Sequence, residues 1–132
     1  MTPRIGAHAP VAGGLAKALS YVDSADAGAV QVFVSNPRAW ALSTPDPAKD
    51  EKFRDGCVQR GIPVYVHASL LVNLGSPTPQ TVAHSTRTLA HALRRAGAIG
   101  AEGVVFHAGS AVDGAHTAAA VRQVRKALLP LL

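Results

Sequence analysis

Apolar residues along the chain gather in four short runs. Between these runs lie longer stretches in which apolar residues recur at every third or fourth position. Short apolar runs followed by glycine, asparagine, proline or serine are typical of buried strands. The pattern therefore predicts four strands. They are expected over Arg4–His8, Ala29–Val34, Pro63–His67 and Gly103–His107.

The longer stretches have the spacing of amphipathic helices. In the first of them, one helix face carries the apolar residues Leu15, Ala18, Leu19 and Val22. Asp46-Pro47 and Thr78-Pro79 each place an N-cap residue before a proline, which is a helix-start signal. The helices are expected over about residues 13–27, 46–61, 78–100 and 115–130.

Strand and helix thus alternate without a hairpin signal, which is typical of a parallel sheet with right-handed crossovers. An open flavodoxin-like sheet and a TIM barrel share this order, so alternation alone does not separate them. A closed (β/α)₈ barrel has roughly 250 residues, whereas this chain has 132 and ends on the apolar run Leu-Leu-Pro-Leu-Leu. We predict one α/β domain over residues 1–132, formed by the first four βα units of a TIM barrel and truncated there.

Composition narrows the class of protein. A hydrophobic fraction of 48% suits a globular core, and no apolar run approaches the roughly 18 residues of a membrane helix. The segment after Met1 lacks the pattern of a secretion signal, so a cytoplasmic location is expected.

Cys57 is the single cysteine, which excludes an internal disulfide and a cysteine-based zinc cluster. We expect it to be a small buried hydrophobe.

The net charge is +5, and it is unevenly distributed. Residues 1–66 hold seven Lys/Arg against six Asp/Glu, whereas residues 67–132 hold six against two. A basic second half suits a polyanionic partner such as nucleic acid. An arginine-rich, solvated helix face would give the same imbalance, so charge alone leaves both interpretations open.

Three of the four predicted strands end in histidine, at His8, His67 and His107. Catalytic and ligand-binding residues of parallel barrels lie at the carboxyl ends of the strands, and imidazole is a common ligand of zinc. We therefore predict metal ligation by His67 and His107, with His8 as a residue that lines the site. The strand ends carry no carboxylate, so the sequence offers only part of a hydrolytic metal site. The remaining histidines are expected at the surface: His84, His91 and His116.

Two loops contain groups suited to phosphate or nucleic acid. The loop after the second predicted strand presents the amide of Asn36, the guanidinium of Arg38 and the indole of Trp40. An ordinary Asn-Pro turn with Trp40 packed inward explains the same residues. The loop after His107 places a glycine and the Ser110 hydroxyl beside a candidate ligand, which suits a bound phosphate.

Taken together, the segments that hold these residues resemble the endonuclease IV family, the zinc-dependent apurinic/apyrimidinic endonucleases. Order and spacing agree across essentially the whole chain. The segments that resemble the family are Ile5–His8, Ala12–Ala16, Phe33–Trp40, His67–Pro77 and Val105–Ser110.

The resemblance implies a monomeric (β/α)₈ barrel with three zinc ions that cleaves DNA on the 5′ side of an abasic site. It implies that His67 and His107 bind one zinc, and that further Glu, Asp and His ligands come from strands beyond Leu132. It also implies DNA contacts by Asn36, Arg38, Leu70 and Ser110. The family often has lysine at Ser35, an aromatic residue at Leu70 and proline at Ala108, so this chain departs from it there.

Two alternatives stay open beside this interpretation. A sugar isomerase or epimerase of the xylose isomerase-like group would have a similar barrel. An inactive fragment is the other alternative, because a half-barrel exposes strand edges and is prone to self-association. We expect the isolated chain to bind zinc weakly and to leave DNA uncut.

Overall fold

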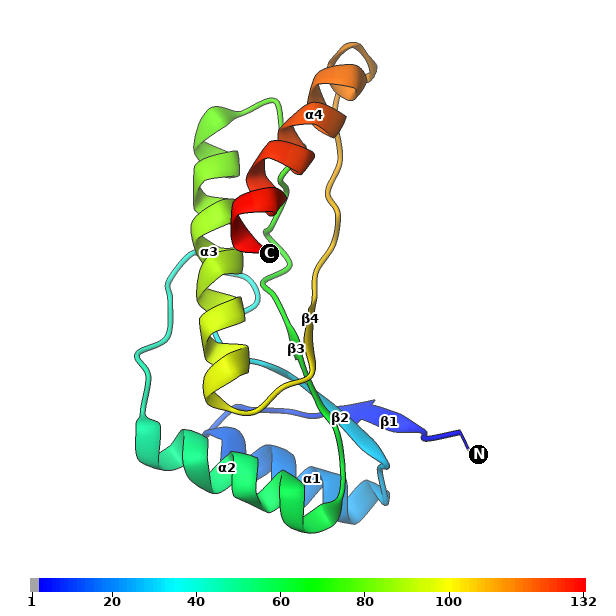
Figure 1. Cartoon of the computed structure of the whole chain (residues 1–132), viewed down its shortest axis with the longest axis vertical. Coiled ribbons are helices and arrows are strands. Elements are labelled where there is room, and N and C mark those ends of the chain that lie inside the picture. Colours follow the sequence, from blue (N-terminus) through cyan, green and yellow to red (C-terminus); the bar gives the residue numbers. More distant parts are fainter. Residues whose placement is uncertain (1–2) are drawn as a thin grey trace.

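The computed structural model describes residues 3–132 and has the predicted alternation of strands and helices (Figure 1). The strands are β1 (Gly6–His8), β2 (Ala29–Phe33), β3 (Val64–His67) and β4 (Gly103–Val105). The helices are α1 (Leu15–Ala25), α2 (Pro47–Arg60), α3 (Pro79–Ala98) and α4 (Thr117–Leu128). Two short 3₁₀ turns flank α4, over Gly114–His116 and Leu129–Leu131.

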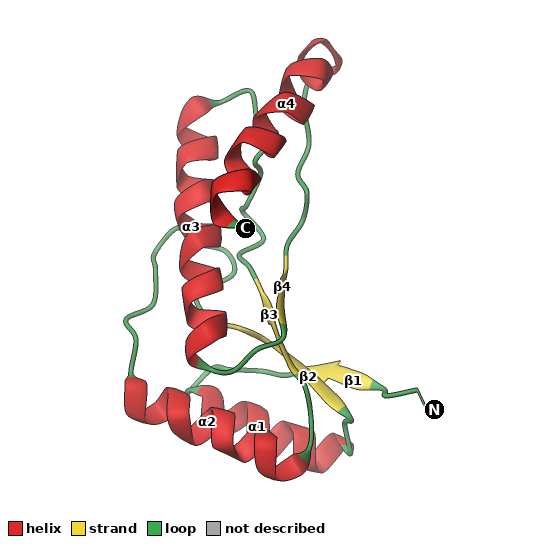
Figure 2. Ribbon diagram, in the orientation of Figure 1, coloured by secondary structure: helices red, strands yellow, loops and turns green. Residues whose placement is uncertain are grey.

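The strands form one parallel sheet in the order β1-β2-β3-β4 (Figure 2). A flavodoxin-like sheet would place the first strand between the second and the third, so the sequential order decides for the barrel type. The register of the strands supports this assignment. His8 at the end of β1 pairs with Gln31 of β2, Gln31 pairs with Tyr65 of β3, and Tyr65 pairs with Gly103 at the start of β4. Such a stagger is a property of tilted barrel strands. The α/β half-barrel prediction is confirmed.

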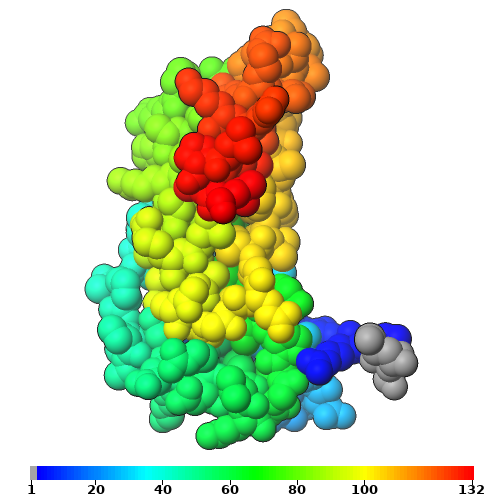
Figure 3. All heavy atoms as spheres, in the orientation of Figure 1, coloured from blue at the N-terminus to red at the C-terminus, as the bar shows by residue number. Residues whose placement is uncertain are grey.

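The two faces of the sheet differ in cover. Val30, Val32, Val64 and Val66 point toward the helices and are at most 1% exposed. The alternate positions, including Phe33 and His67, are only half-buried, and Val105 is 41% exposed. This second face corresponds to the interior of a closed barrel. At the β1 edge, Ile5 is 83% exposed on a segment that projects from the body (Figure 3).

The two ends of α2 have the capping residues from which the sequence predicts its boundaries. The Asp46 side chain accepts a hydrogen bond from the Lys49 backbone N–H, and Pro47 follows at the first helical position. Gly61 ends the helix in the left-handed region, with φ of 61°. Cys57 on this helix is 2% exposed, as expected. In the described part of the chain, no helix is long and apolar enough to cross a membrane.

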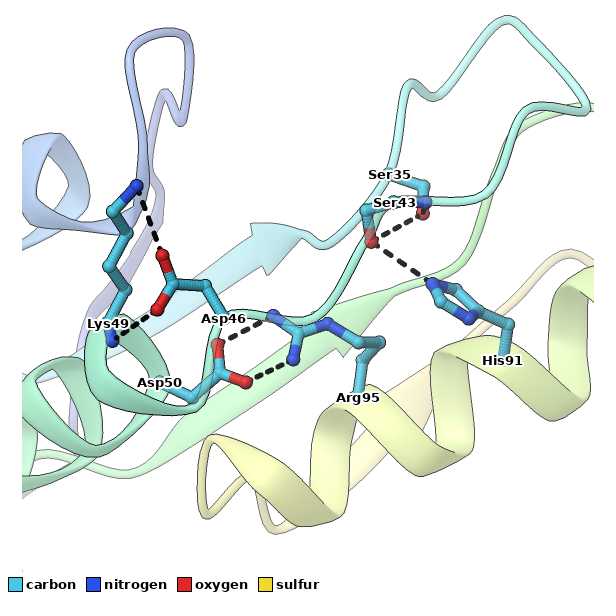
Figure 4. Close-up of polar contacts among 7 residues, drawn as sticks. All are labelled: Ser35, Ser43, Asp46, Lys49, Asp50, His91 and Arg95. Carbon is cyan, nitrogen blue, oxygen red and sulfur yellow. Dashed lines mark hydrogen bonds and ion pairs between the residues drawn. The ribbon is translucent and has the colours of Figure 1, made fainter.

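The surface prediction for His91 is wrong, because this side chain on α3 is only 7% exposed. The segment between β2 and α2 packs over that helix face, and Ser43 Oγ lies 3.1 Å from His91 Nε2 (Figure 4). His84, about two turns earlier on the same helix, is half-buried, with its ring centroid 5.2 Å from that of Trp40. Trp40 therefore packs inward.

Candidate metal and nucleic-acid site

Three imidazoles gather at the carboxyl ends of β1, β3 and β4. The ring centroid of His67 lies 6.3 Å from that of His8 and 5.2 Å from that of His107. Phe33, at the end of β2, fills the space between two of them, with centroids 4.6 Å from His8 and 5.2 Å from His67. The residues predicted from the strand ends are thus brought together on the uncovered face of the sheet.

Hydrogen bonds orient two of these rings. His67 Nδ1 lies 2.7 Å from the Ala68 carbonyl oxygen, and His8 Nδ1 lies 2.9 Å from Gln31 Oε1. Both oxygens are acceptors, so each Nδ1 donates, and in the neutral form of the ring Nε2 has the free lone pair. Metal-ligating histidines have this arrangement, with the other ring nitrogen donating to a carbonyl or carboxylate. The geometry suits coordination through Nε2.

Carboxylates lie away from the histidines. Glu102 accepts a hydrogen bond from the Tyr65 hydroxyl at 3.1 Å, near the amino end of β4. Asp113 caps the short turn that follows, accepting from the Ala115 N–H at 2.9 Å. Within residues 3–132, no group of three or more His, Cys, Asp or Glu side chains is arranged to hold a metal ion. A structural zinc site takes four ligands, so His67 and His107 alone would supply only part of one.

The predicted loop residues lie in the loops that follow β2, β3 and β4. Asn36 Oδ1 accepts a hydrogen bond from the Arg38 N–H at 2.9 Å, which closes the Asn-Pro turn and leaves Arg38 exposed. Leu70, in the β3–α3 loop, is 43% exposed, and Ser110 is exposed in the β4–α4 loop. An open cleft of about 530 Å³ runs between the loops that follow β1 and β2, with Phe33 and Asn36 in its lining.

Two residues that our sequence reasoning missed tie these loops together. Ser69 Oγ donates to the Pro37 carbonyl at 2.9 Å, so the β3–α3 loop holds the β2–α2 loop. Asn73 Oδ1 accepts from the Ser110 N–H at 3.0 Å, so it also holds the β4–α4 loop. A polar residue within the apolar run from Leu70 to Leu74 was the available signal for Asn73.

Comparison with known proteins places the chain in a family. Residues 19–132 match the family described as "Xylose isomerase-like TIM barrel". The chain is 52% identical over 129 residues to the probable endonuclease 4 of Streptomyces coelicolor, a match that covers 97% of this chain and 44% of that protein. The probable endonuclease 4 of Streptomyces avermitilis is also 52% identical, with 42% of its length covered.

Solved structures agree with this assignment. Endonuclease IV from Thermus thermophilus superposes with a TM-score of 0.79 at 33% identity, over 94% of this chain and 46% of that one. A D-psicose 3-epimerase gives a TM-score of 0.66 at 11% identity, which shows a shared fold alone. The chain thus spans less than half the length of the curated relatives it matches. The chain belongs to the xylose isomerase-like TIM-barrel family, and the curated relatives described above carry the name probable endonuclease 4.

Proposed function

We propose that residues 1–132 correspond to the amino-terminal half of a zinc-dependent DNA-repair endonuclease that hydrolyses the backbone on the 5′ side of abasic sites. The observation that carries the proposal is the 52% identity to a probable endonuclease 4 over nearly the whole chain. The closeness of the His67 and His107 rings, at 5.2 Å, supports it independently. A DNA substrate also makes the cytoplasm the expected location.

In this proposal, His67 and His107 contribute two ligands to one zinc ion, and His8 lines the site without coordinating. Bound zinc supplies a Lewis acid that neutralises the scissile phosphate and activates water. The hydrogen bond from His67 Nδ1 to the Ala68 carbonyl holds that ring ready to coordinate. The other ligands come from the rest of the barrel, because Glu102 and Asp113 lie away from the histidines and bond to other partners.

DNA contacts are proposed for Asn36, Arg38, Leu70 and Ser110. The exposed guanidinium of Arg38 suits a phosphate, and the net charge of +5 favours approach to a polyanion. The exposed Leu70 side chain is able to wedge between base steps that an abasic site has already loosened. Ser110 offers a hydroxyl and a loop backbone beside His107.

A sugar isomerase or epimerase is less well supported. The structural likeness to epimerases comes at 11% identity for D-psicose 3-epimerase, against 33% for the Thermus endonuclease. Such low identity carries information about fold and none about chemistry. We therefore retain isomerisation only as an outcome to be measured.

A chimaera tests the proposed function. Residues 1–132 would replace the matching region of the Streptomyces coelicolor endonuclease 4, and the zinc-loaded protein would be assayed on a duplex with one abasic site. We expect incision 5′ of the lesion, none of an undamaged duplex, and loss of incision in the H67A and H107A variants. A folded, zinc-loaded chimaera that leaves the abasic duplex intact would exclude the proposed activity for this sequence. Ketose isomerisation by the same chimaera would favour the alternative.

A further inference from the structure

The three loops around the histidines form one hydrogen-bonded unit. We call it the loop bridge, and define it as Pro37, Ser69, Leu70, Asn73 and Ser110. Each bond between its members joins segments that are more than thirty residues apart in the chain. The segments leading out of β3 and β4 lie near each other in Figure 1, as these bonds require.

The first half of the bridge is centred on Ser69. Its side chain is buried, at 7% exposure, and its hydroxyl donates to the Pro37 carbonyl while accepting from the Leu71 N–H at 3.2 Å. The Leu70 N–H donates to the same carbonyl at 2.9 Å. Two donors on one carbonyl fix the spacing between the loop that carries Arg38 and the loop that carries Leu70.

The second half is centred on Asn73. Its Oδ1 accepts from the N–H groups of Gly75 and Ser110, each at 3.0 Å. Its own backbone N–H donates at 2.9 Å to the hydroxyl of Ser85, which is fully buried on α3. Asn73 is therefore anchored in the helix layer and reaches out to hold the Ser110 loop.

Glycine at position 109 makes this approach possible. Gly109 has φ of +97°, a conformation that side chains disfavour, and a Cβ there would lie 2.3 Å from Asn73 Oδ1. Any larger residue would push the β4–α4 loop off the asparagine. The close contact is thus built into the backbone as well as the side chain.

We propose that Ser69 and Asn73 are positioning residues that join three loops into a single DNA-contacting surface. They hold the loops that carry Arg38, Leu70 and Ser110 at fixed spacing. This inference rests on the proposed function, and it assigns Ser69 and Asn73 no contact with DNA. Its physical basis is preorganisation: loops that are already tied together lose less conformational freedom when they bind.

The test uses the full 132-residue chain, a fluorescent duplex with one abasic site, and amide hydrogen exchange. S69A and N73A should each weaken duplex binding by about three- to tenfold, the effect of losing about one net hydrogen bond. N73A should also speed exchange at the Ser110 amide. N73D keeps an acceptor oxygen and should restore slow exchange at the Ser110 amide. The matched control is S76A, since Ser76 is also buried, at 5% exposure, but its hydroxyl accepts from the Thr78 N–H within its own loop and joins no second loop of the described residues.

Repeating the S69A measurement in an R38A variant separates a positioning role from a general loss of stability. If Ser69 acts through the loop that carries Arg38, S69A should have little effect on binding once Arg38 is alanine. An equal loss in both backgrounds would overturn the proposal for Ser69. Unchanged Ser110 exchange in N73A would overturn it for Asn73. A wild-type chain that binds abasic and undamaged duplexes equally would count against the proposed function, and the exchange measurement would still decide on the bridge.

Discussion

Arg95 on α3 and Asp50 on α2 form a bidentate ion pair in which the side chains are 8% and 6% exposed. Arg95 Nη2 donates to Asp50 Oδ1 at 2.7 Å, and Nη1 donates to the other carboxylate oxygen (Figure 4). The pair links helices from consecutive βα units. Because both charges are removed from water, each depends on the other for compensation.

The D50N variant should lower the free energy of unfolding by about 3–5 kcal/mol, because it leaves a buried guanidinium without a counter-charge. Urea denaturation measures this change. K49A is the matched control on the same helix: Lys49 pairs with Asp46 at the surface, with its side chain 77% exposed, so its loss should change stability far less. A loss in D50N no larger than that in K49A would contradict the prediction.

Acid should destabilise the fold through His91. Burial, and then the charges of Arg94 and Arg95, lower the pKa of this imidazole. The unfolded chain, with a histidine pKa of about 6.5, therefore takes up the proton first as the pH falls. Stability is full above that value and is lost as the pH falls toward the folded-state pKa. Unfolding free energies measured across this range should show a smaller pH dependence in H91Q, and an unchanged dependence would refute the assignment.

The Cys57 thiol should be unreactive in the folded protein. Burial raises its pKa to about 11, although the nearby Arg60 acts in the opposite direction. The thiolate is the reactive form, so at pH 8 a thiol reagent should modify the native chain on the order of a hundredfold more slowly than the urea-unfolded chain. The C57A variant, which has no thiol, gives the background rate of this assay. Comparable rates in native and unfolded protein would show that the side chain is accessible.

Zinc should bind the isolated chain weakly. Two imidazoles give part of a coordination shell, so the binding free energy should fall well below the roughly 10–16 kcal/mol of complete structural zinc sites. Calorimetry should show that H67A and H107A each abolish binding, whereas H116A, in the turn before α4, leaves it intact. The chain alone should not incise an abasic duplex. Tight stoichiometric zinc together with efficient incision would disprove this view of the site.

Self-association is expected through the uncovered sheet face and the edges formed by β1 and β4. Sedimentation should depend on concentration, and V105K should shift the chain toward monomer by placing a charge on that face. V58K is the matched control, because Val58 is 73% exposed on α2. Monomeric behaviour at every concentration would contradict the expectation.

The strands and helices were predictable because their signals are local. Asp46 and Gly61 delimit α2 as predicted, and three of the four strands begin within one residue of the expected position. β4 ends at Val105 rather than at His107, because its partner β3 ends at His67, which pairs with Val105. The meeting of His67 and His107 was predictable as well, because parallel strands end at the same edge.

Burial of His91 and the loop bridge were not predictable in this way. His91 is covered by a segment that lies about fifty residues away in the chain, at Ser43. Ser69 and Asn73 likewise contact partners in other loops. Helical periodicity and turn signals describe neighbours in sequence, and these contacts depend on how loops meet after the sheet has formed.

The stagger of the strands has a consequence for the imidazoles. His67 is level with Phe33, two residues beyond the level of His8, and His107 lies two residues beyond Val105, which is level with His67. In an untilted sheet each step of two residues would separate the rings by about 6.6 Å along the strands, whereas tilted strands bring them to a common rim. Each offset between neighbouring histidine positions is an even number of residues, so all three rings lie on the same side of the sheet. A one-residue insertion that shifted β3 against β2 would turn His67 toward the helices and leave a valine at the rim.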